Sequence, residues 1–174
     1  MRTIYLLLVL ITYNLSAQEI KRVDSDKSII NYTGKHFLHK WSAENKNISG
    51  LIQIENETIS NIGVVAKVSD FRSGNSNLDS NSLRVLDALK FPNVIFRSTD
   101  INQENGQIRI DGIMNFHGIE KDINISAKVV QLDGSIKLSG KLSVYLTDFL
   151  VDRPSLLTMK VDDEINLEFE LFFN

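Results

Sequence analysis

The chain has 174 residues, of which 43% are hydrophobic and 24% are charged, and its formal net charge is −3. This composition is typical of one globular domain, because disordered chains have fewer apolar residues and a larger net charge. The charge gives no reason to expect nucleic-acid binding, and no run of lysine and arginine indicates anchoring on an anionic membrane. The absence of cysteine excludes disulfide bonds, thiolate metal sites and cysteine nucleophiles.

The first 17 residues have the features of a secretory signal peptide. Arg2 supplies a positive charge, residues 4–13 form an apolar stretch too short to cross a bilayer, and small residues precede Gln18. We expect cleavage after Ala17, which leaves residues 18–174 as one exported domain, periplasmic or secreted. The alternative is a buried N-terminal strand or helix. No later segment is apolar enough to span a membrane.

From Ile20 onward, apolar and polar residues alternate with a period of two. This pattern is typical of strands with one buried and one solvated face, and so of an antiparallel sheet. Strands are predicted at residues 28–35, 48–55, 62–69, 94–99, 108–116, 123–129, 136–146 and 165–173.

Turn and helix signals separate these strands. Asn105-Gly106, Asp133-Gly134 and His117-Gly118 place glycine where a tight hairpin turn requires a positive φ. Leucines at helical spacing predict one short helix over residues 80–89, capped by Asp79 or Ser80 and ended before Pro92.

The predicted fold is therefore all-β, an antiparallel β-barrel with one short helix. So many strands must protect their edges, and closure into a barrel does this; a two-sheet sandwich is the alternative. Gly112 and Gly140, each inside a strand, favour a curved and closing sheet.

Catalytic and metal-binding patterns are weak. His36 and His39 have an odd spacing that would place them on opposite faces of one strand, and His117 lies far away in sequence. No nucleophile elbow, phosphate-binding loop or dinucleotide fingerprint is present in the sequence. The acidic run at residues 162–164 is interpreted as a solvated turn. We predict no catalytic residue, no metal and no cofactor.

The aromatic residues allow two interpretations. They supply large apolar surfaces that either fill a core or line a ligand cavity, and a small barrel can do either. Periodicity does not distinguish a filled barrel from a hollow one.

Several segments together resemble the YceI-like family. Residues 71–75 lead to a short helix that ends in a Lys-Phe-Pro sequence at residues 90–92, and a strand with Phe and Ser follows at residues 94–98. Residues 112–123 are similar to the family's glycine-rich hairpin. Residues 140–149 resemble its penultimate strand and the following Asp-Phe pair, and Lys35, His36 and Trp41 resemble an early Lys-His strand.

The resemblance implies a lipocalin-like barrel with a long apolar cavity for isoprenoid chains or related amphiphiles, usually exported to the periplasm and associated with dimers. One stretch departs from the family. Many relatives carry Arg-Asp-x-His-Leu before the helix, whereas this chain has Ser-Asn-Leu-Asp-Ser at residues 76–80. If that stretch contacts a polar head group, the head group bound here differs.

The predicted ligand-binding residues combine an apolar lumen with polar groups near its opening. The lumen is assigned from the aromatic residues and the inward face of the strands, and the polar groups from the helix region and the early Lys-His strand. The lumen residues are Phe37, Trp41, Leu86, Leu89, Phe96, Met114, Phe116, Leu142, Val144 and Phe149, and the polar residues are His36, Asp79 and Arg84.

Three functions follow from these expectations. The first is an exported carrier or buffer of an isoprenoid-type or quinone-like lipid, not an enzyme. The second is a structural or interaction protein with a filled barrel and no ligand. The third is an enzyme that uses the three histidines, and the missing motifs make it the weakest.

Overall fold

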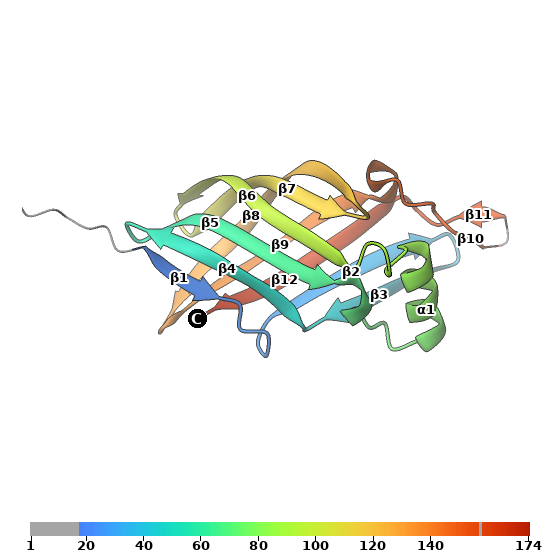
Figure 1. Ribbon diagram of the computed structural model, residues 1–174, viewed down its shortest axis with the longest axis horizontal. Helices are drawn as coiled ribbons and strands as arrows, with labels where there is room; N and C mark the ends of the chain where they lie inside the picture. Colours follow the sequence, from blue (N-terminus) through green and yellow to red (C-terminus); the bar gives the residue numbers. More distant parts are fainter. Residues whose placement is uncertain (1–17, 157) are drawn as a thin grey trace, which may run out of the picture.

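The computed structural model describes residues 18–156 and 158–174, so the predicted signal peptide lies outside the described residues. The described chain is mostly strand, with one α-helix (Figure 1). The elements are β1 (Glu19–Arg22), β2 (Ile29–His36), β3 (His39–Asn45), β4 (Ile48–Glu55), β5 (Thr58–Lys67), η1 (Val68–Asp70), α1 (Ser76–Val85), β6 (Asn93–Glu104), β7 (Gln107–Phe116), β8 (Ile119–Leu132), β9 (Ser135–Tyr145), η2 (Leu146–Phe149), β10 (Ser155–Leu156), β11 (Met159–Lys160) and β12 (Glu164–Phe173).

Ten strands form one antiparallel sheet in the order β1-β4-β5-β6-β7-β8-β9-β12-β2-β3, and β10 and β11 form a separate small hairpin. The sheet curls so that its apolar face encloses the core, which confirms the predicted lipocalin-like barrel over the alternative sandwich (Figure 1). The sequence alternation sets this arrangement, because every second side chain along a strand turns inward. All eight predicted strands are present, most of them longer than predicted; the prediction at residues 62–69 ends at Lys67, where η1 begins.

Two short backbone ladders give further partners to the two edge strands of the sheet, β1 and β3. Near the chain ends, the N–H groups of Arg22 and Asn174 each donate to the other residue's carbonyl, at 2.8 and 2.9 Å, and Val23 forms a bridge with Phe173. At the opposite end, Glu44 on β3 and Arg72 after η1 exchange two backbone hydrogen bonds, at 3.0 and 2.8 Å. The first ladder closes the sheet on itself, whereas the second ties the sheet to the segment that leads into α1.

The hairpin turns follow the prediction. Asn105 and Gly106 have φ of 52° and 74°, and His117 and Gly118 have φ of 53° and 77°. Two successive positive φ angles give the turn that matches the twist of antiparallel strands.

The helix lies four residues earlier than predicted. Asn75 caps it by accepting hydrogen bonds from the N–H groups of Asn77 and Leu78. The predicted cap Asp79 is already engaged, because its carboxylate accepts from the N–H and the hydroxyl of Ser73 at 2.9 and 2.5 Å. The helix ends at Val85, well before Pro92, because Asp87 has a left-handed φ of 43°.

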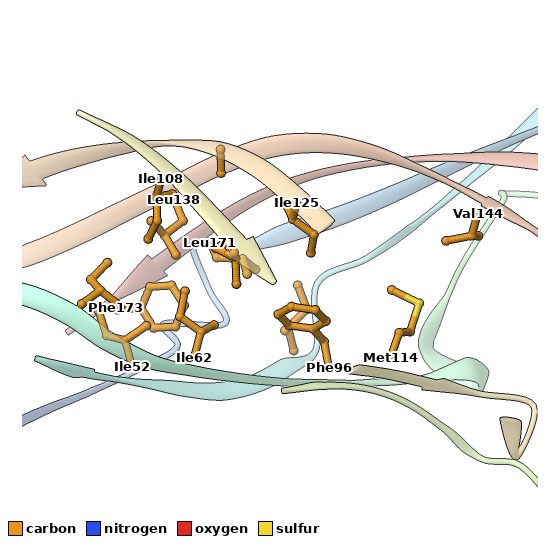
Figure 2. Close-up of a cluster of buried hydrophobic side chains, with 14 of the residues drawn as sticks. Ile52, Ile62, Phe96, Ile108, Met114, Ile125, Leu138, Val144, Leu171 and Phe173 are labelled. Carbon is orange, nitrogen blue, oxygen red and sulfur yellow. The ribbon is translucent and has the colours of Figure 1, made fainter. Parts of the chain in front are cut away.

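The core fills one end of the barrel densely. Around Ile52, Ile108 and Phe173, which are almost completely buried, the inward side chains interlock. Figure 2 shows these residues on one side of the cluster, Phe96 and Ile125 in the middle, and Met114 and Val144 on the other side. We call the part around Ile52, Ile108 and Phe173 the filled end.

Candidate functional site

The opposite end of the barrel is hollow. A cavity of about 380 Å³ lies between α1 and the inner face of the sheet, and we call this part the hollow end. Its walls are mainly apolar side chains from strands that meet there. They include Tyr32, Trp41, Val68, Phe71, Val94, Met114, Phe116, Val144, Leu146, Val151, Val161, Ile165 and Leu167.

Helix α1 lies at this end of the barrel (Figure 1), and its side chains form part of the cavity wall. Leu78 and Val85, together with Leu83 and Leu86, point toward the cavity, yet none of the helix's ten residues, all of them described, is fully buried. A helix packed directly on a core normally buries its apolar stripe. Here the stripe faces an open space instead, so apolar surface remains available to a ligand.

A set of polar groups lies among these apolar walls. Burial raises the pKa of the Tyr32 hydroxyl, and the nearby Asp79 carboxylate raises it further, so Tyr32 stays a neutral phenol at physiological pH. Asp79 stays ionised, because the hydrogen bonds from the Ser73 hydroxyl and N–H hold the pKa of its carboxyl below the usual value. Arg84 extends from the same helix and donates to Asn81 at 3.3 Å. The site therefore offers a neutral phenol, an anion and a cation beside its apolar walls.

His36 and His39 lie together, which corrects the expectation that their spacing separates them. Residues 37–38 form a two-residue turn, so His36 ends β2, His39 begins β3, and their ring centroids lie 5.9 Å apart. His36 Nε2 is 3.2 Å from the Met159 carbonyl oxygen, which can only accept, so this nitrogen carries the hydrogen. His36 Nδ1 is buried without a hydrogen-bond partner among the described residues.

Eight of the thirteen predicted site residues line the cavity. They come from the β2–β3 hairpin, α1, β7 and β9, which the fold brings to the same end of the barrel. They are His36, Trp41, Asp79, Arg84, Leu86, Met114, Phe116 and Val144.

The other five lie elsewhere. Phe37 occupies the outward turn between β2 and β3, and Leu89 is fully exposed in the turn after α1, because the helix ends earlier than predicted. Phe96 is a core residue whose ring covers Gly112. Leu142 lies on β9 just beyond Gly140, where the pairing with β8 stops, and packs half-buried against the core.

Phe149, the fifth, supports the wall instead of lining it. Strands β8 and β9 pair only over Ala127–Leu132 and Ser135–Gly140, and η2 packs against β8 beyond this point. The Phe149 side chain is buried there against Phe116, with ring centroids 5.3 Å apart, and the Phe149 carbonyl lies 3.0 Å from His117 Nδ1. Phe149 therefore holds Phe116 in place at the cavity wall.

Sequence reasoning missed several lining residues. Val94, Ile165 and Leu167 belong to predicted strands, but alternation assigns them only to an inner face and not to one end of it. Tyr32 and His39 had no distinctive pattern, and β3 was not predicted because its sequence is largely polar. Two features of the sequence pointed to this hairpin: the resemblance at Lys35 and His36, and the prediction that Trp41 lines the lumen.

The described residues contain no group of three or more histidine, cysteine, aspartate or glutamate side chains that could hold a metal ion. Within the part of the chain that the structure describes, no helix is both long and apolar enough to cross a membrane.

Residues 22–173 match the model of the YceI-like domain. The chain belongs to the YceI-like family. Among solved structures, it is similar to Burkholderia cenocepacia BcnA, with 19% identity, a TM-score of 0.78, and coverage of 86% of this chain and 98% of that one. A polyisoprenoid binding domain from Saccharophagus degradans implicated in plant cell wall breakdown matches with 12% identity, a TM-score of 0.73, and coverage of 88% and 97%.

The Campylobacter jejuni YceI protein also matches, with 17% identity, a TM-score of 0.64, and coverage of 98% of this chain and 91% of that one. At these identities the likeness shows a shared fold. No curated protein matches the chain by sequence.

Proposed function

We propose that this YceI-like protein is an exported binder that sequesters or carries an isoprenoid-type or similar amphiphilic lipid in the cavity of the hollow end. The observation that carries the proposal is a cavity of about 380 Å³ with largely apolar walls, beneath a helix whose apolar face is only partly buried. A polyprenyl chain offers no hydrogen bonds, so its binding site needs dry walls and few polar groups.

The cavity size indicates how much of the ligand is enclosed. A dry cavity of about 150 Å³ holds one benzene molecule, so 380 Å³ corresponds to roughly 15 carbons, or three isoprene units. Each buried CH₂ contributes about 0.8 kcal/mol, so a segment of this length binds without a sequence motif. The filled end stops a longer chain from passing through the barrel.

The polar groups support a ligand with a small hydroxyl-bearing head. Nε2 of His36 carries a hydrogen toward Met159, and Nδ1 is buried without a hydrogen-bond partner among the described residues. Tyr32, Asp79 and Arg84 line the same cavity. A prenyl alcohol combines the apolar chain with a hydroxyl donor that these groups recognise.

Two further observations support the proposal. The family match covers residues 22–173, and one structural relative is described as a polyisoprenoid binding domain. The N-terminal sequence supports export, with the mature chain beginning at Gln18. Binding without catalysis is the function these features favour.

Lipid extraction tests the proposal. The full chain is expressed in a bacterial host, its cell fractions and N-terminal sequence are determined, and the protein is purified without detergent and extracted for mass spectrometry. We expect a mature protein that begins at Gln18 and carries one stoichiometric isoprenoid or quinone-like species. Folded protein that remains lipid-free after incubation with envelope lipids would contradict the proposal.

A chain-length series tests the size of the site. Trp41 is the single tryptophan of the chain and lines the cavity, so its fluorescence reports binding. We expect affinity for prenyl alcohols to rise from geraniol to farnesol and to change little for geranylgeraniol and longer chains. A steady rise beyond farnesol would show that the barrel encloses a longer chain than the cavity volume indicates.

A further inference from the structure

Three bulky apolar side chains are exposed together at the hollow end. Phe37 and Leu38 occupy the turn between β2 and β3 and are 56% and 55% exposed, and Met159 on β11 is 48% exposed. Tight hairpin turns favour small or polar residues such as Asn and Gly, so a Phe-Leu turn lowers solubility without helping the turn form. We call Phe37, Leu38 and Met159 the apolar tip.

Hydrogen bonds join the two segments that carry the apolar tip. His36 Nε2 donates to the Met159 carbonyl at 3.2 Å, and the Asp162 N–H donates to the Lys35 carbonyl at 2.9 Å. The β2–β3 hairpin and the β10–β11 hairpin therefore project from the same end of the barrel (Figure 1). The exposed apolar side chains therefore belong to two segments that meet at this end, although these segments are more than a hundred residues apart in sequence.

Three lysines lie close to the apolar tip. Lys35 and Lys40 face each other across the β2–β3 ladder, and Lys160 follows Met159 on β11. From Gly34 to Ala43 the sequence contains no acidic residue. Two acidic residues are also near: Asp162, whose N–H donates to the Lys35 carbonyl, and Asp152 in the segment before β10. The fold thus gathers lysines that the sequence alone does not show as a cluster.

We propose that the apolar tip docks the protein on an anionic phospholipid bilayer. Phe37 and Leu38 enter the boundary between head groups and acyl chains, while Lys35 and Lys40 contact the anionic head groups. His36 and His39 belong to the same hairpin and line the cavity, so docking brings the cavity to the membrane surface. This inference goes beyond the proposed function, because it depends on the exposed surface and not on what the cavity holds.

Vesicle co-sedimentation tests the docking with pure phospholipids. The mature protein is mixed with vesicles of phosphatidylglycerol and phosphatidylcholine in equal parts, or of phosphatidylcholine alone, without any isoprenoid. We expect binding to the anionic vesicles that weakens as salt rises, because salt screens the lysine contacts. The absence of isoprenoid makes this result independent of cavity binding.

Matched variants locate the docking surface. The Phe37→Ser/Leu38→Ser variant removes the apolar contacts and is expected to weaken vesicle binding at least tenfold. The Lys35→Gln/Lys40→Gln variant removes the contacts with anionic head groups and is expected to weaken vesicle binding about fivefold for each lysine. Val130→Ser/Leu132→Ser is the control, since both residues are 44% exposed on β8, away from the tip. All these side chains are exposed or half-buried, so the variants are expected to fold, which circular dichroism checks.

Several outcomes would overturn this inference. The first is that the wild-type protein does not bind anionic vesicles, and the second is that it binds neutral vesicles equally well. The third is that the Phe37→Ser/Leu38→Ser variant binds anionic vesicles as well as the control variant does. Light scattering that shows a dimer dissolved by Phe37→Ser/Leu38→Ser, without vesicle binding, would assign the apolar tip to self-association instead.

Discussion

The two ends of the barrel are built from the same alternating strands but differ in what covers them. At the filled end, backbone hydrogen bonds between Arg22 and Asn174 close the sheet, and Ile52, Ile108 and Phe173 pack to nearly complete burial. At the hollow end, α1 lies over the sheet with its apolar residues half-buried. Where strands pair and close the sheet, the inward side chains pack against one another. Where the helix covers the sheet, a cavity remains between the two. One barrel thus combines a stabilising core with a binding site.

Paired phenylalanine truncations are expected to show the largest contrast between the ends. Phe173→Ala removes a fully buried ring from the filled end and should lower the free energy of unfolding by about 3–5 kcal/mol. Phe116→Ala removes the same atoms from the cavity wall, where one side has few partners, and should cost about 1.5 kcal/mol. Urea unfolding of both variants measures the difference. Equal losses would show that the hollow end is packed as tightly as the filled end.

Filling the cavity is expected to affect binding more than stability. In Met114→Trp the indole occupies space beside Val144 and Phe116, and the affinity for farnesol should fall at least tenfold, or about 1.4 kcal/mol. Leu132→Trp, which adds the same group to an exposed position, is the matched control. Radiolabelled farnesol measures both, because the added tryptophan alters the fluorescence signal. Unchanged binding by folded Met114→Trp would place the ligand outside this cavity.

The smallest expected difference is in pH dependence. Hydrogen bonds from Ser73 lower the pKa of Asp79 at the hollow end, so its contribution to stability is present above the ordinary aspartate pKa of about 3.9. The contribution is lost as pH falls through the lowered value, and it is small because Asp79 is largely solvated. Urea midpoints measured between neutral pH and about pH 3 should fall slightly less in Asp79→Asn than in the wild type. If the urea midpoints of the two proteins change identically with pH, the Asp79 carboxylate does not stabilise the start of α1.

The alternation in the sequence was enough to predict the sheet, because a period of two directly reports which face of a strand is buried. It could not predict β3, whose exposed face is rich in charged and polar residues, such as Lys40 and Glu44. The helix was placed too late because a carboxylate that caps a helix and one that binds a preceding serine look alike in sequence, and Asp79 does the latter.

The candidate site was predictable only in part, because the same residue types fill a core and line a cavity. Phe96 and Phe116 both point inward, yet Phe96 covers Gly112 within the core while Phe116 faces the open space. Whether an inward side chain lies in the core or at the cavity depends on the position of α1 and on where neighbouring strands stop pairing. The local periodicity of the sequence reports neither. The polar residues His36, Asp79 and Arg84 were predicted from the Lys-His strand and the helix, and all three line the cavity.

The ladder between Arg22–Asp24 and Phe172–Asn174 also constrains how the chain reaches its fold. These segments are about as far apart in the sequence as the domain allows, so loop-closure entropy opposes their meeting until most of the sheet exists. The filled end stays open until β12, the last strand of the chain described here, has joined the sheet. We therefore expect closure of the barrel to be late and slow, in the millisecond-to-second range of proteins dominated by long-range strand pairing.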